Sequence, residues 1–235
     1  MKVLVIPDIH LKGWMFDIAD QFLIDNKAEK ALCLMDIPDD WGREYDLEAY
    51  RDSFEKMISF AEKHPDTLWC WGNHDLSYIW NKLESGYSYT AKYLVSEYLA
   101  RFRRIVPEDQ IGYIHRIDDT LFMHGGLTES FVRHCVDGVD FDDTDAVIEK
   151  INSFGSDIMW SDSSPLWFRP QYDGRRLYLP DKFLQVVGHT PVSEIRLNGS
   201  LLSCDVFSTF SDGRPIGTQM FAMVDTVAKT FSGIQ

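Results

Sequence analysis

The sequence predicts an α/β protein, with a largely parallel sheet in the first half and antiparallel or mixed strands in the second half. Strand-like apolar runs alternate with amphipathic helical segments up to Asp75, and this alternation is typical of parallel sheets. From Glu194 onward, short strand-like runs alternate with turns instead. No repeat, linker or low-complexity tract interrupts the 235 residues, so we expect a single domain over residues 1–235.

Three strands and two helices are predicted in the first half. Apolar residues at helical spacing predict helices over Trp14–Asn26 and Leu47–Lys63. The buried strands lie before, between and after these helices, at Val3–Pro7, Ala31–Met35 and Thr67–Trp71. The aromatic-rich segment Tyr78–Phe102 is predicted to be helical and to belong to an insertion around residues 76–112. Packing of this insertion on the core is favoured over a role as a cap above the substrate.

The second half is predicted to begin with a hairpin and to end in short strands. Tyr113–Ile117 and Thr120–Met123 form the hairpin around Asp118-Asp119, and Asp145–Phe154 is a predicted helix. The remaining predicted strands are Phe183–Val187, Ile195–Leu197, Leu201–Ser203, Gln219–Val224 and Thr226–Phe231. The short strands separated by turns indicate antiparallel or mixed pairing.

The chain is acidic, with 37 acidic and 23 basic residues and a formal net charge of −14. A negative surface repels polyanions, which disfavours generic nucleic-acid binding but still allows a small phosphorylated substrate at a local cationic site. No apolar run is long enough to span a bilayer or to act as a signal peptide, so we expect a cytoplasmic protein without membrane association. Nothing in the sequence indicates the oligomeric state.

Each of five predicted strands is followed by a polar cluster of a type that binds metals. The clusters are Asp8-Ile9-His10, Asp36-Ile37-Pro38-Asp39-Asp40, Gly72-Asn73-His74-Asp75, His124-Gly125-Gly126 and Gly188-His189-Thr190-Pro191. Binding sites of open α/β sheets form beyond the carboxyl ends of the strands. Any one of these clusters alone would be typical of a surface loop, but five in order predict that they converge on one site.

The donor atoms in these clusters indicate which metals they would bind. Carboxylate, imidazole and amide groups form a mixed nitrogen and oxygen set, which suits manganese, iron or zinc better than calcium or magnesium. Asp8 and His10 are two residues apart, so both can face one ion from an extended segment. Asp36 has a carboxylate that can bridge two ions. A second ion can then be completed by Asn73, His124 and His189.

Together these motifs resemble those of the calcineurin-like metallophosphoesterases, and most closely the phosphoprotein phosphatase branch that includes bacterial and phage serine/threonine phosphatases. The resemblance runs from Lys2 to about Asp205. It implies two mixed β-sheets packed as a sandwich and flanked by helices. It also implies two divalent transition-metal ions, with manganese favoured and iron or zinc as alternatives. The implied ligands are Asp8, His10 and Asp36 for the first ion, and Asp36, Asn73, His124 and His189 for the second.

The activity expected from this resemblance is hydrolysis of a phosphomonoester by a hydroxide that bridges the two metals, with phosphoserine and phosphothreonine in proteins as the substrates. His74 would protonate the leaving alkoxide, and Asp39 would orient the His74 imidazole. A nucleotide-directed hydrolase is the alternative, acting on dinucleoside polyphosphates, cyclic nucleotides or nucleic-acid end phosphates. An inactive metal-binding scaffold is a third hypothesis.

The sequence departs from the family pattern at two positions. Met35 stands where the family usually has glycine, and Asp40 stands where it usually has an arginine that holds a phosphate oxygen. We expect Arg169, which ends the Pro165-Leu166-Trp167-Phe168-Arg169 segment, to bind the phosphate together with Asn73; a solvated loop arginine is the alternative. For Asp205, a role in a strand-end turn is favoured over a contact near the metals.

Overall fold

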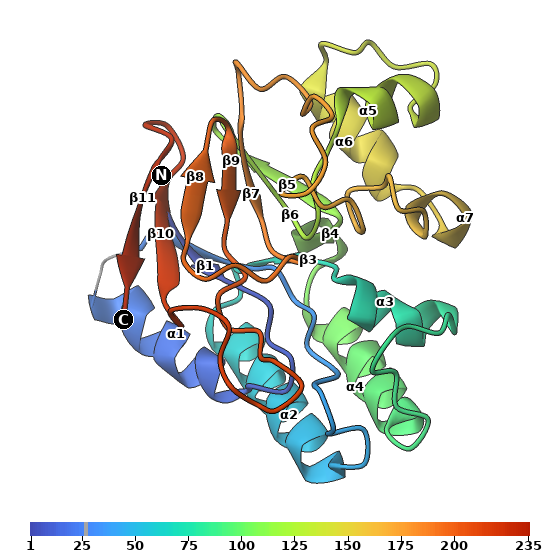
Figure 1. Ribbon diagram of the computed structural model, residues 1–235, viewed down its shortest axis with the longest axis vertical. Helices are drawn as coiled ribbons and strands as arrows, with labels where there is room; N and C mark the ends of the chain where they lie inside the picture. Colours follow the sequence, from blue (N-terminus) through green and yellow to red (C-terminus); the bar gives the residue numbers. More distant parts are fainter. Residues whose placement is uncertain (26–27) are drawn as a thin grey trace.

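The computed structural model describes residues 1–25 and 28–235 and contains two β-sheets with helices around them (Figure 1). The first sheet has the strand order β11-β10-β1-β2-β3-β4. In it, β1, β2, β3 and β4 run parallel, whereas β10 pairs antiparallel with β1 and with β11. The bounds are β1 Lys2–Ile6, β2 Lys30–Cys33, β3 Leu68–Cys70, β4 Ile111–Gly112, β10 Phe221–Asp225 and β11 Thr230–Ile234.

The second sheet has the order β5-β6-β7-β9-β8 and is also mixed. Its central strands β6, β7 and β9 are parallel, and the outer strands β5 and β8 are antiparallel to their neighbours. The bounds are β5 Ile114–Ile117, β6 Thr120–Met123, β7 Leu184–Val187, β8 Arg196–Asn198 and β9 Leu201–Ser203. The predicted hairpin is therefore confirmed as β5 and β6.

A buried apolar layer joins the two sheets. Val3 and Val5 of β1 belong to one cluster with Phe122 of β6 and Val186 of β7, all fully buried. The alternate residues of β1, such as Leu4, point to the opposite face and join a second cluster that includes side chains of the helices. Successive side chains of a strand point to opposite faces, so each face of the first sheet has its own core. The predicted sandwich of two mixed sheets flanked by helices is confirmed.

Three helices, α1, α2 and α6, lie close to where the sequence predicts them, whereas α5 and α7 were not predicted. The second helix matches its predicted bounds and is capped by Asp46, whose side chain accepts a hydrogen bond from the N–H of Ala49. The first ends at Asp25, and Asn26, to which the prediction extends, lies outside the described residues. The bounds are α1 Trp14–Asp25, α2 Leu47–Lys63, α3 Asn73–Trp80, α4 Lys92–Ile105, α5 Glu129–Cys135, α6 Thr144–Asn152 and α7 Ser156–Met159, with a 3₁₀ turn at Glu108–Gln110.

Two predicted elements were wrong in extent. The continuous helix expected over Tyr78–Phe102 is interrupted, because α3 ends at Asn81 in the left-handed region (φ 55°) and α4 begins only at Lys92. The last strand begins at Thr230 rather than at residue 226, because Asp225 accepts hydrogen bonds from two following N–H groups and forms a turn. No helix within the described part of the chain is long and apolar enough to cross a membrane.

Candidate metal centre

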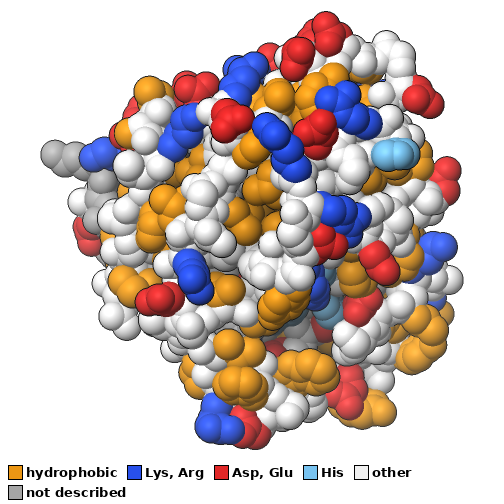
Figure 2. Space-filling view, turned by 45° about the horizontal axis from the view of Figure 1, so that its top comes forward, with side chains coloured by type: hydrophobic (Ala, Val, Ile, Leu, Met, Phe, Trp, Pro, Cys, Tyr) orange, Lys and Arg blue, Asp and Glu red, His pale blue; other side chains and the backbone are white. Residues whose placement is uncertain are grey.

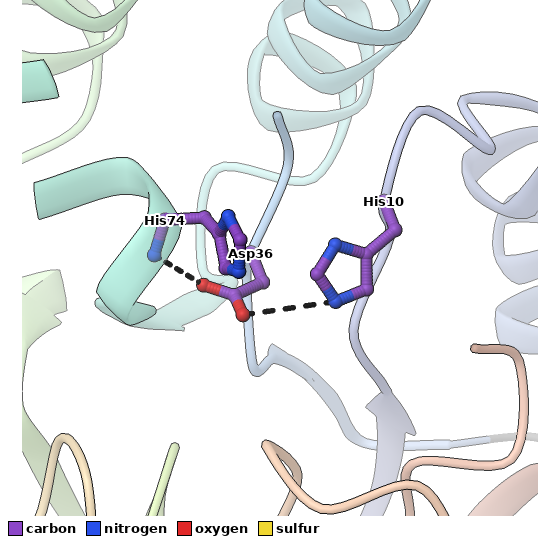
Figure 3. Close-up of side chains that lie close together, drawn as sticks. All are labelled: His10, Asp36 and His74. Carbon is purple, nitrogen blue, oxygen red and sulfur yellow. Dashed lines mark hydrogen bonds and ion pairs between the residues drawn. The ribbon is translucent and has the colours of Figure 1, made fainter. Parts of the chain in front are cut away.

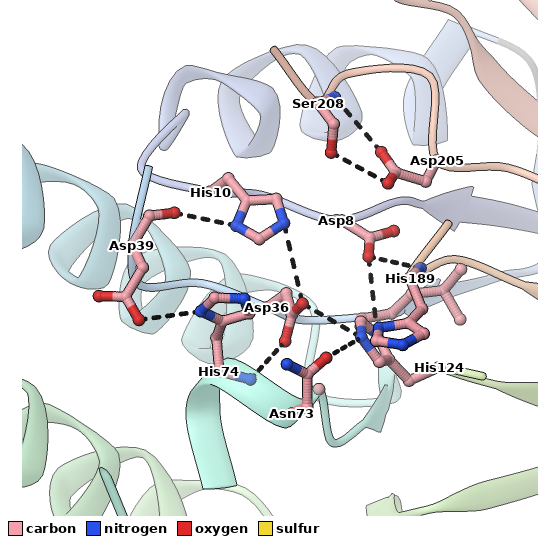
Figure 4. A network of polar contacts seen from close by, with 12 residues as sticks. Asp8, His10, Asp36, Asp39, Asn73, His74, His124, His189, Asp205 and Ser208 are labelled. Atoms are coloured by element: carbon pink, nitrogen blue, oxygen red, sulfur yellow. Dashed lines mark hydrogen bonds and ion pairs between the residues drawn. The ribbon is translucent and has the colours of Figure 1, made fainter. Parts of the chain in front are cut away.

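The loops that follow strands of both sheets meet at one cluster of polar side chains (Figure 4). Asp8 follows β1 in the first sheet, and its Oδ1 accepts a hydrogen bond of 2.7 Å from the N–H of His189, which follows β7 in the second sheet. His124 follows β6, and its Nε2 lies 3.1 Å from Oδ2 of Asp36, which follows β2. These contacts span the two sheets, so the predicted convergence of strand ends is observed.

Asp36 lies at the centre of the cluster and belongs to two groups of possible metal ligands. One group consists of His10, Asp36 and His74, and the other of Asp36, His124 and His189. Within each group the ligand atoms lie within 4.8 Å of one another. Figure 3 shows His10 and His74 on either side of the Asp36 carboxylate, with His10 Nε2 at 3.8 Å from Oδ2.

The first group contains His74 in place of Asp8, which the sequence suggested as a ligand of the first ion. His74 is close to Asp36, whereas Asp8 lies deeper, with Oδ1 3.7 Å from His124 Nδ1. Asn73, at the start of α3, has its Oδ1 3.0 Å from His124 Nε2 and so lies beside the second group. The six side chains expected as ligands therefore share one cluster.

Hydrogen bonds orient the imidazole rings of His124 and His10 in the cluster. Nδ1 of His124 lies 3.0 Å from the carbonyl of Leu34, and Nδ1 of His10 lies 2.9 Å from the carbonyl of Asp39. A carbonyl oxygen can only accept, so each Nδ1 carries a hydrogen, and Nε2 is the ring nitrogen of each residue that faces Asp36. This arrangement is common for histidines that bind metals through Nε2.

Backbone geometry also shapes the cluster. Met35 and Asp36 adopt left-handed conformations (φ 55° and 47°), which cost a non-glycine residue roughly 1–3 kcal/mol. The carboxylate of Asp75 holds this turn by accepting hydrogen bonds from the N–H groups of Asp36, Ile37 and Gly72. A glycine at position 35 would adopt this conformation at little cost, so Met35 adds strain at this turn.

Two glycines allow the carboxylates to approach neighbouring turns. A Cβ atom at Gly72 would lie 2.0 Å from Oδ1 of Asp36, and one at Gly188 would lie 2.1 Å from Oδ2 of Asp8. Neither position can accept a side chain unless the carboxylate moves. The glycines of the motifs thus keep space for Asp36 and Asp8 at the ends of their strands.

The electrostatics of the cluster fit the binding of a cation. Burial raises the pKa of Asp8, and the nearby charges of Asp205 and Asp36 raise it further. Burial lowers the pKa of His189, with the charges of His124 and Arg169 adding to the effect. Oδ2 of Asp8 and Nε2 of His189 are buried without a hydrogen-bond partner among the described residues.

Unpaired buried acceptors are costly, and coordination of a metal satisfies them. The orphaned carboxylate and imidazole atoms, the Nε2 atoms that face Asp36 and the mixed donor set all fit divalent transition-metal ions.

His74 forms a second polar unit at the edge of the cluster. Its Nδ1 lies 2.9 Å from Oδ2 of Asp39, and Oδ1 of Asp39 accepts hydrogen bonds of 2.6 Å from the hydroxyl groups of Tyr50 and Tyr78. Burial acts to lower the pKa of His74, but the charges of Asp36 and Asp39 outweigh it and raise the pKa to about 9. The two tyrosines were not found by sequence reasoning, since they lie on separate helices.

A pocket of about 530 Å³ opens above the cluster and is lined by His10, Asp36, Asn73, His74, Arg169 and His189, among others. Figure 2 shows a hollow in which histidine and acidic side chains are visible, with hydrophobic side chains around it. Nη1 of Arg169 donates to the carbonyl of His189 and to the hydroxyl of Thr190. Arg169 is therefore held at the pocket wall rather than free in solvent.

The His124-Gly125-Gly126 turn anchors the segment that carries Arg169. The N–H of Gly125 donates to the carbonyl of Pro165, and the N–H of Gly126 donates to the carbonyl of Phe168. A Cβ atom at Gly125 would lie 2.9 Å from both of these carbonyl oxygens. The glycine next to His124 thus permits the close approach that brings Arg169 to the same pocket as the cluster.

The structure changes the roles expected for Asp40 and Asp205, and it adds Lys12, which the sequence did not indicate. Asp40, at the position of the missing arginine, pairs with the buried Nζ of Lys12 at 3.1 Å. Asp205 makes the expected strand-end turn by accepting from the N–H and hydroxyl of Ser208, and it also lines the pocket. No spacing pattern signals Lys12, because its partner is 28 residues away.

Comparison with known proteins identifies the family of the chain. A family model described as calcineurin-like phosphoesterase matches residues 1–214. A cold-active protein tyrosine phosphatase is similar in structure, with a TM-score of 0.53 and 15% identity over 100% of this chain and 78% of the other. A protein serine/threonine phosphatase from Saccharomyces cerevisiae has a TM-score of 0.47 and 17% identity, covering 86% of this chain and 66% of the other. A search of curated proteins finds no match. Similarity at these identities concerns the fold alone.

Proposed function

The chain belongs to the calcineurin-like phosphoesterases, a family of metal-dependent phosphoric ester hydrolases, and we propose that it hydrolyses alkyl phosphomonoesters. The observation that carries this proposal is the His74–Asp39 pair beside Asp36. An alkoxide is a poor leaving group and gains from a positioned general acid, whereas a phenolate needs little protonation. A buried acid that is oriented by a carboxylate therefore favours an alkyl ester.

In this proposal two divalent ions occupy the cluster. Asp8, His10 and Asp36 hold the first ion, and Asp36, Asn73, His124 and His189 hold the second, with manganese favoured over iron or zinc. Support comes from Asp36, which belongs to both ligand groups. When bound, the ions polarise the phosphoryl oxygens and activate water as the nucleophile.

The chain's own side chains would then bind the phosphate and move the proton. Arg169 and the Asn73 amide hold equatorial oxygens of the phosphate. Nε2 of His74 gives its proton to the leaving oxygen, and Asp39 keeps the imidazole oriented through Nδ1. The hydroxyl groups of Tyr50 and Tyr78 hold Asp39 in place, since both donate to its Oδ1.

Two classes of substrate contain an alkyl phosphomonoester. Phosphoserine and phosphothreonine in proteins are the first, and nucleotides are the second. The second is favoured by the exposed aromatic side chains of Trp41 and Phe210, which line the pocket. Cyclic nucleotides and dinucleoside polyphosphates would engage the same metals but require hydrolysis of a diester or an anhydride.

A turnover panel in manganese tests the function. We expect the protein to hydrolyse phosphoserine peptides or nucleoside monophosphates faster than cyclic nucleotides and diadenosine tetraphosphate. A chelator added to the same reactions should abolish all turnover. Hydrolysis of diesters or anhydrides alone would contradict the monoesterase proposal.

The role of Arg169 leads to a separate prediction. A guanidinium grips phosphate through two parallel hydrogen bonds, whereas an ammonium offers a point charge. Arg169→Ala should therefore lower kcat/KM on every phosphoester by roughly tenfold or more, and Arg169→Lys should recover only part of this loss. Steady-state kinetics on two unrelated substrates would measure both effects. Arg101→Ala on α4 is the control, and equal kinetics for Arg169→Ala and this control would contradict the assignment.

A further inference from the structure

Two large aromatic side chains are exposed at the pocket that contains the proposed catalytic groups. Trp41 is 58% exposed and Phe210 is 48% exposed, and both line the pocket together with His74 and Arg169. They come from opposite ends of the chain, since Trp41 follows β2 and Phe210 follows β9. Exposed aromatic faces in an active pocket are suited to stacking on a planar group.

Asp40 holds the two segments together. Its Oδ1 accepts hydrogen bonds from the N–H of Trp41 at 2.9 Å and from the hydroxyl of Thr209, next to Phe210, at 3.0 Å. Its Oδ2 accepts from Nζ of Lys12 at 3.1 Å, so its negative charge is compensated within the protein. Asp40 thus links the two aromatic positions across 169 residues of sequence.

The turn that carries Phe210 is ordered by its own contacts. The N–H of Phe210 donates to the carbonyl of Arg214, and Thr209 and Pro215 form a β-bridge. The guanidinium carbon of Arg214 lies 5.6 Å from the centre of the Phe210 ring. A side chain held in place before binding loses little conformational freedom when a ligand arrives.

We propose that Trp41 and Phe210 bind a planar aromatic group of the substrate, and that Asp40 and Thr209 are positioning residues for this aromatic pair. The inference rests on the proposed function and deepens it. Arg169 and Asn73 would bind the phosphate, His74 would protonate an alkoxide, and the aromatic pair would bind a planar group beyond that alkoxide. An alkyl phosphomonoester that carries a planar group is the chemistry of a nucleoside monophosphate.

The test compares two substrates that differ only in the planar group. Adenosine 5′-monophosphate and ribose 5-phosphate share the same phosphate and the same primary alkoxide. We expect the wild-type protein to prefer the nucleotide by about tenfold or more in kcat/KM, the usual effect of stacking one base on an aromatic side chain. Trp41→Ala and Phe210→Ala should each remove most of this preference through KM, while turnover of ribose 5-phosphate stays within about twofold.

Matched variants separate recognition from folding. Tyr93→Ala removes an aromatic side chain that is 83% exposed on α4, and it should leave the preference unchanged. Thr209→Val removes the hydrogen bond to Asp40 and should raise KM for the nucleotide alone, whereas Thr209→Ser keeps the hydroxyl and should behave as wild type. A phosphoserine peptide with tryptophan beside the phosphoserine, compared with its glycine counterpart, tests whether a peptide can supply the planar group. The nucleotide assignment would be overturned if kcat/KM were higher for the tryptophan peptide than for the glycine peptide but no higher for the nucleotide than for ribose 5-phosphate.

Binding measured without turnover distinguishes the two proposals. Calorimetric titration should show tighter binding of adenosine 5′-monophosphate than of ribose 5-phosphate, and Trp41→Ala should abolish the difference. Nucleotide binding of this kind, with no hydrolysis of any alkyl phosphomonoester, would refute the proposed function but support the aromatic pair. Equal affinity for the two compounds, or equal losses on both in Trp41→Ala, would overturn the inference.

Discussion

Replacement of His74 by asparagine should lower kcat on alkyl phosphomonoesters by about 10²–10⁴-fold, the usual contribution of a positioned general acid. Asparagine occupies a similar volume and still offers polar atoms to Asp39, but it cannot deliver a proton to an alkoxide. The loss should be much smaller on an aryl ester, because a phenolate leaves without protonation. Parallel assays on phosphoserine and on a chromogenic aryl phosphate measure the difference.

The metal content of the His74→Asn variant provides the control. His74 lies beside Asp36 and is one of the three side chains in the first ligand group, so its replacement must be shown to leave the metals in place. Elemental analysis should find the same occupancy as in the wild type. Equal losses on alkyl and aryl esters would show that His74 is not the acid. A loss of metal would instead make His74 a ligand.

Replacement of Tyr50 or Tyr78, which both donate hydrogen bonds to Asp39, should also lower kcat on alkyl phosphomonoesters, but by a smaller factor. Tyr50→Phe and Tyr78→Phe each remove one hydrogen bond of 2.6 Å to the same oxygen of Asp39. The Asp39–His74 contact itself stays intact in both variants. Their effect on alkyl esters should therefore be smaller than that of His74→Asn.

Local sequence patterns were enough to predict the strands of the sandwich except the two-residue strand β4. The apolar stripe of α2 and its Asp46 cap are contained within a short segment, and the predicted bounds match. The helix expected over Tyr78–Phe102 was wrong because Asn81 ends α3 in a left-handed conformation, which apolar spacing does not reveal. Periodicity describes which face is buried, but it does not determine where the backbone turns.

The polar cluster could be predicted because its residues follow the ends of adjacent parallel strands. β1 and β2 are neighbours in one sheet, and β6 and β7 are neighbours in the other, so their following loops meet. The pairing of Asp40 with Lys12 and Thr209 could not be predicted. It depends on the conformations of loops separated by 28 and 169 residues, and neither Lys12 nor Thr209 belongs to a spaced motif.

The contacts of Asp40 change the role that we assign to this residue. From the sequence alone, an aspartate in place of an arginine suggests repulsion of a dianionic phosphate. In the structure its charge is paired with a lysine that is 7% exposed, and its oxygens hold the Trp41 and Thr209 segments. Asp40 is therefore better described as a support for the pocket wall than as a charge that faces the substrate.

Replacement of Asp36 by asparagine should weaken metal binding at both sites and lower kcat/KM by more than about 100-fold, because even residues that only orient a metal ligand contribute 10- to 100-fold. Asp36 belongs to both ligand groups, and its two oxygens face different neighbours: Oδ1 accepts from the N–H of His74, and Oδ2 faces Nε2 of His124 and of His10. Asparagine keeps the shape but removes the negative charge and one oxygen.

The measurement for Asp36→Asn need not depend on activity. A ligand that binds only the folded state raises the melting temperature, so added manganese should stabilise the wild type clearly and the Asp36→Asn variant much less. Asp157→Asn, on the short helix α7, is the control and should respond as the wild type does. Elemental analysis then separates the possible roles. Loss of both ions supports a bridging carboxylate, loss of one ion assigns Asp36 to a single site, and full occupancy of both would remove Asp36 from the ligand set.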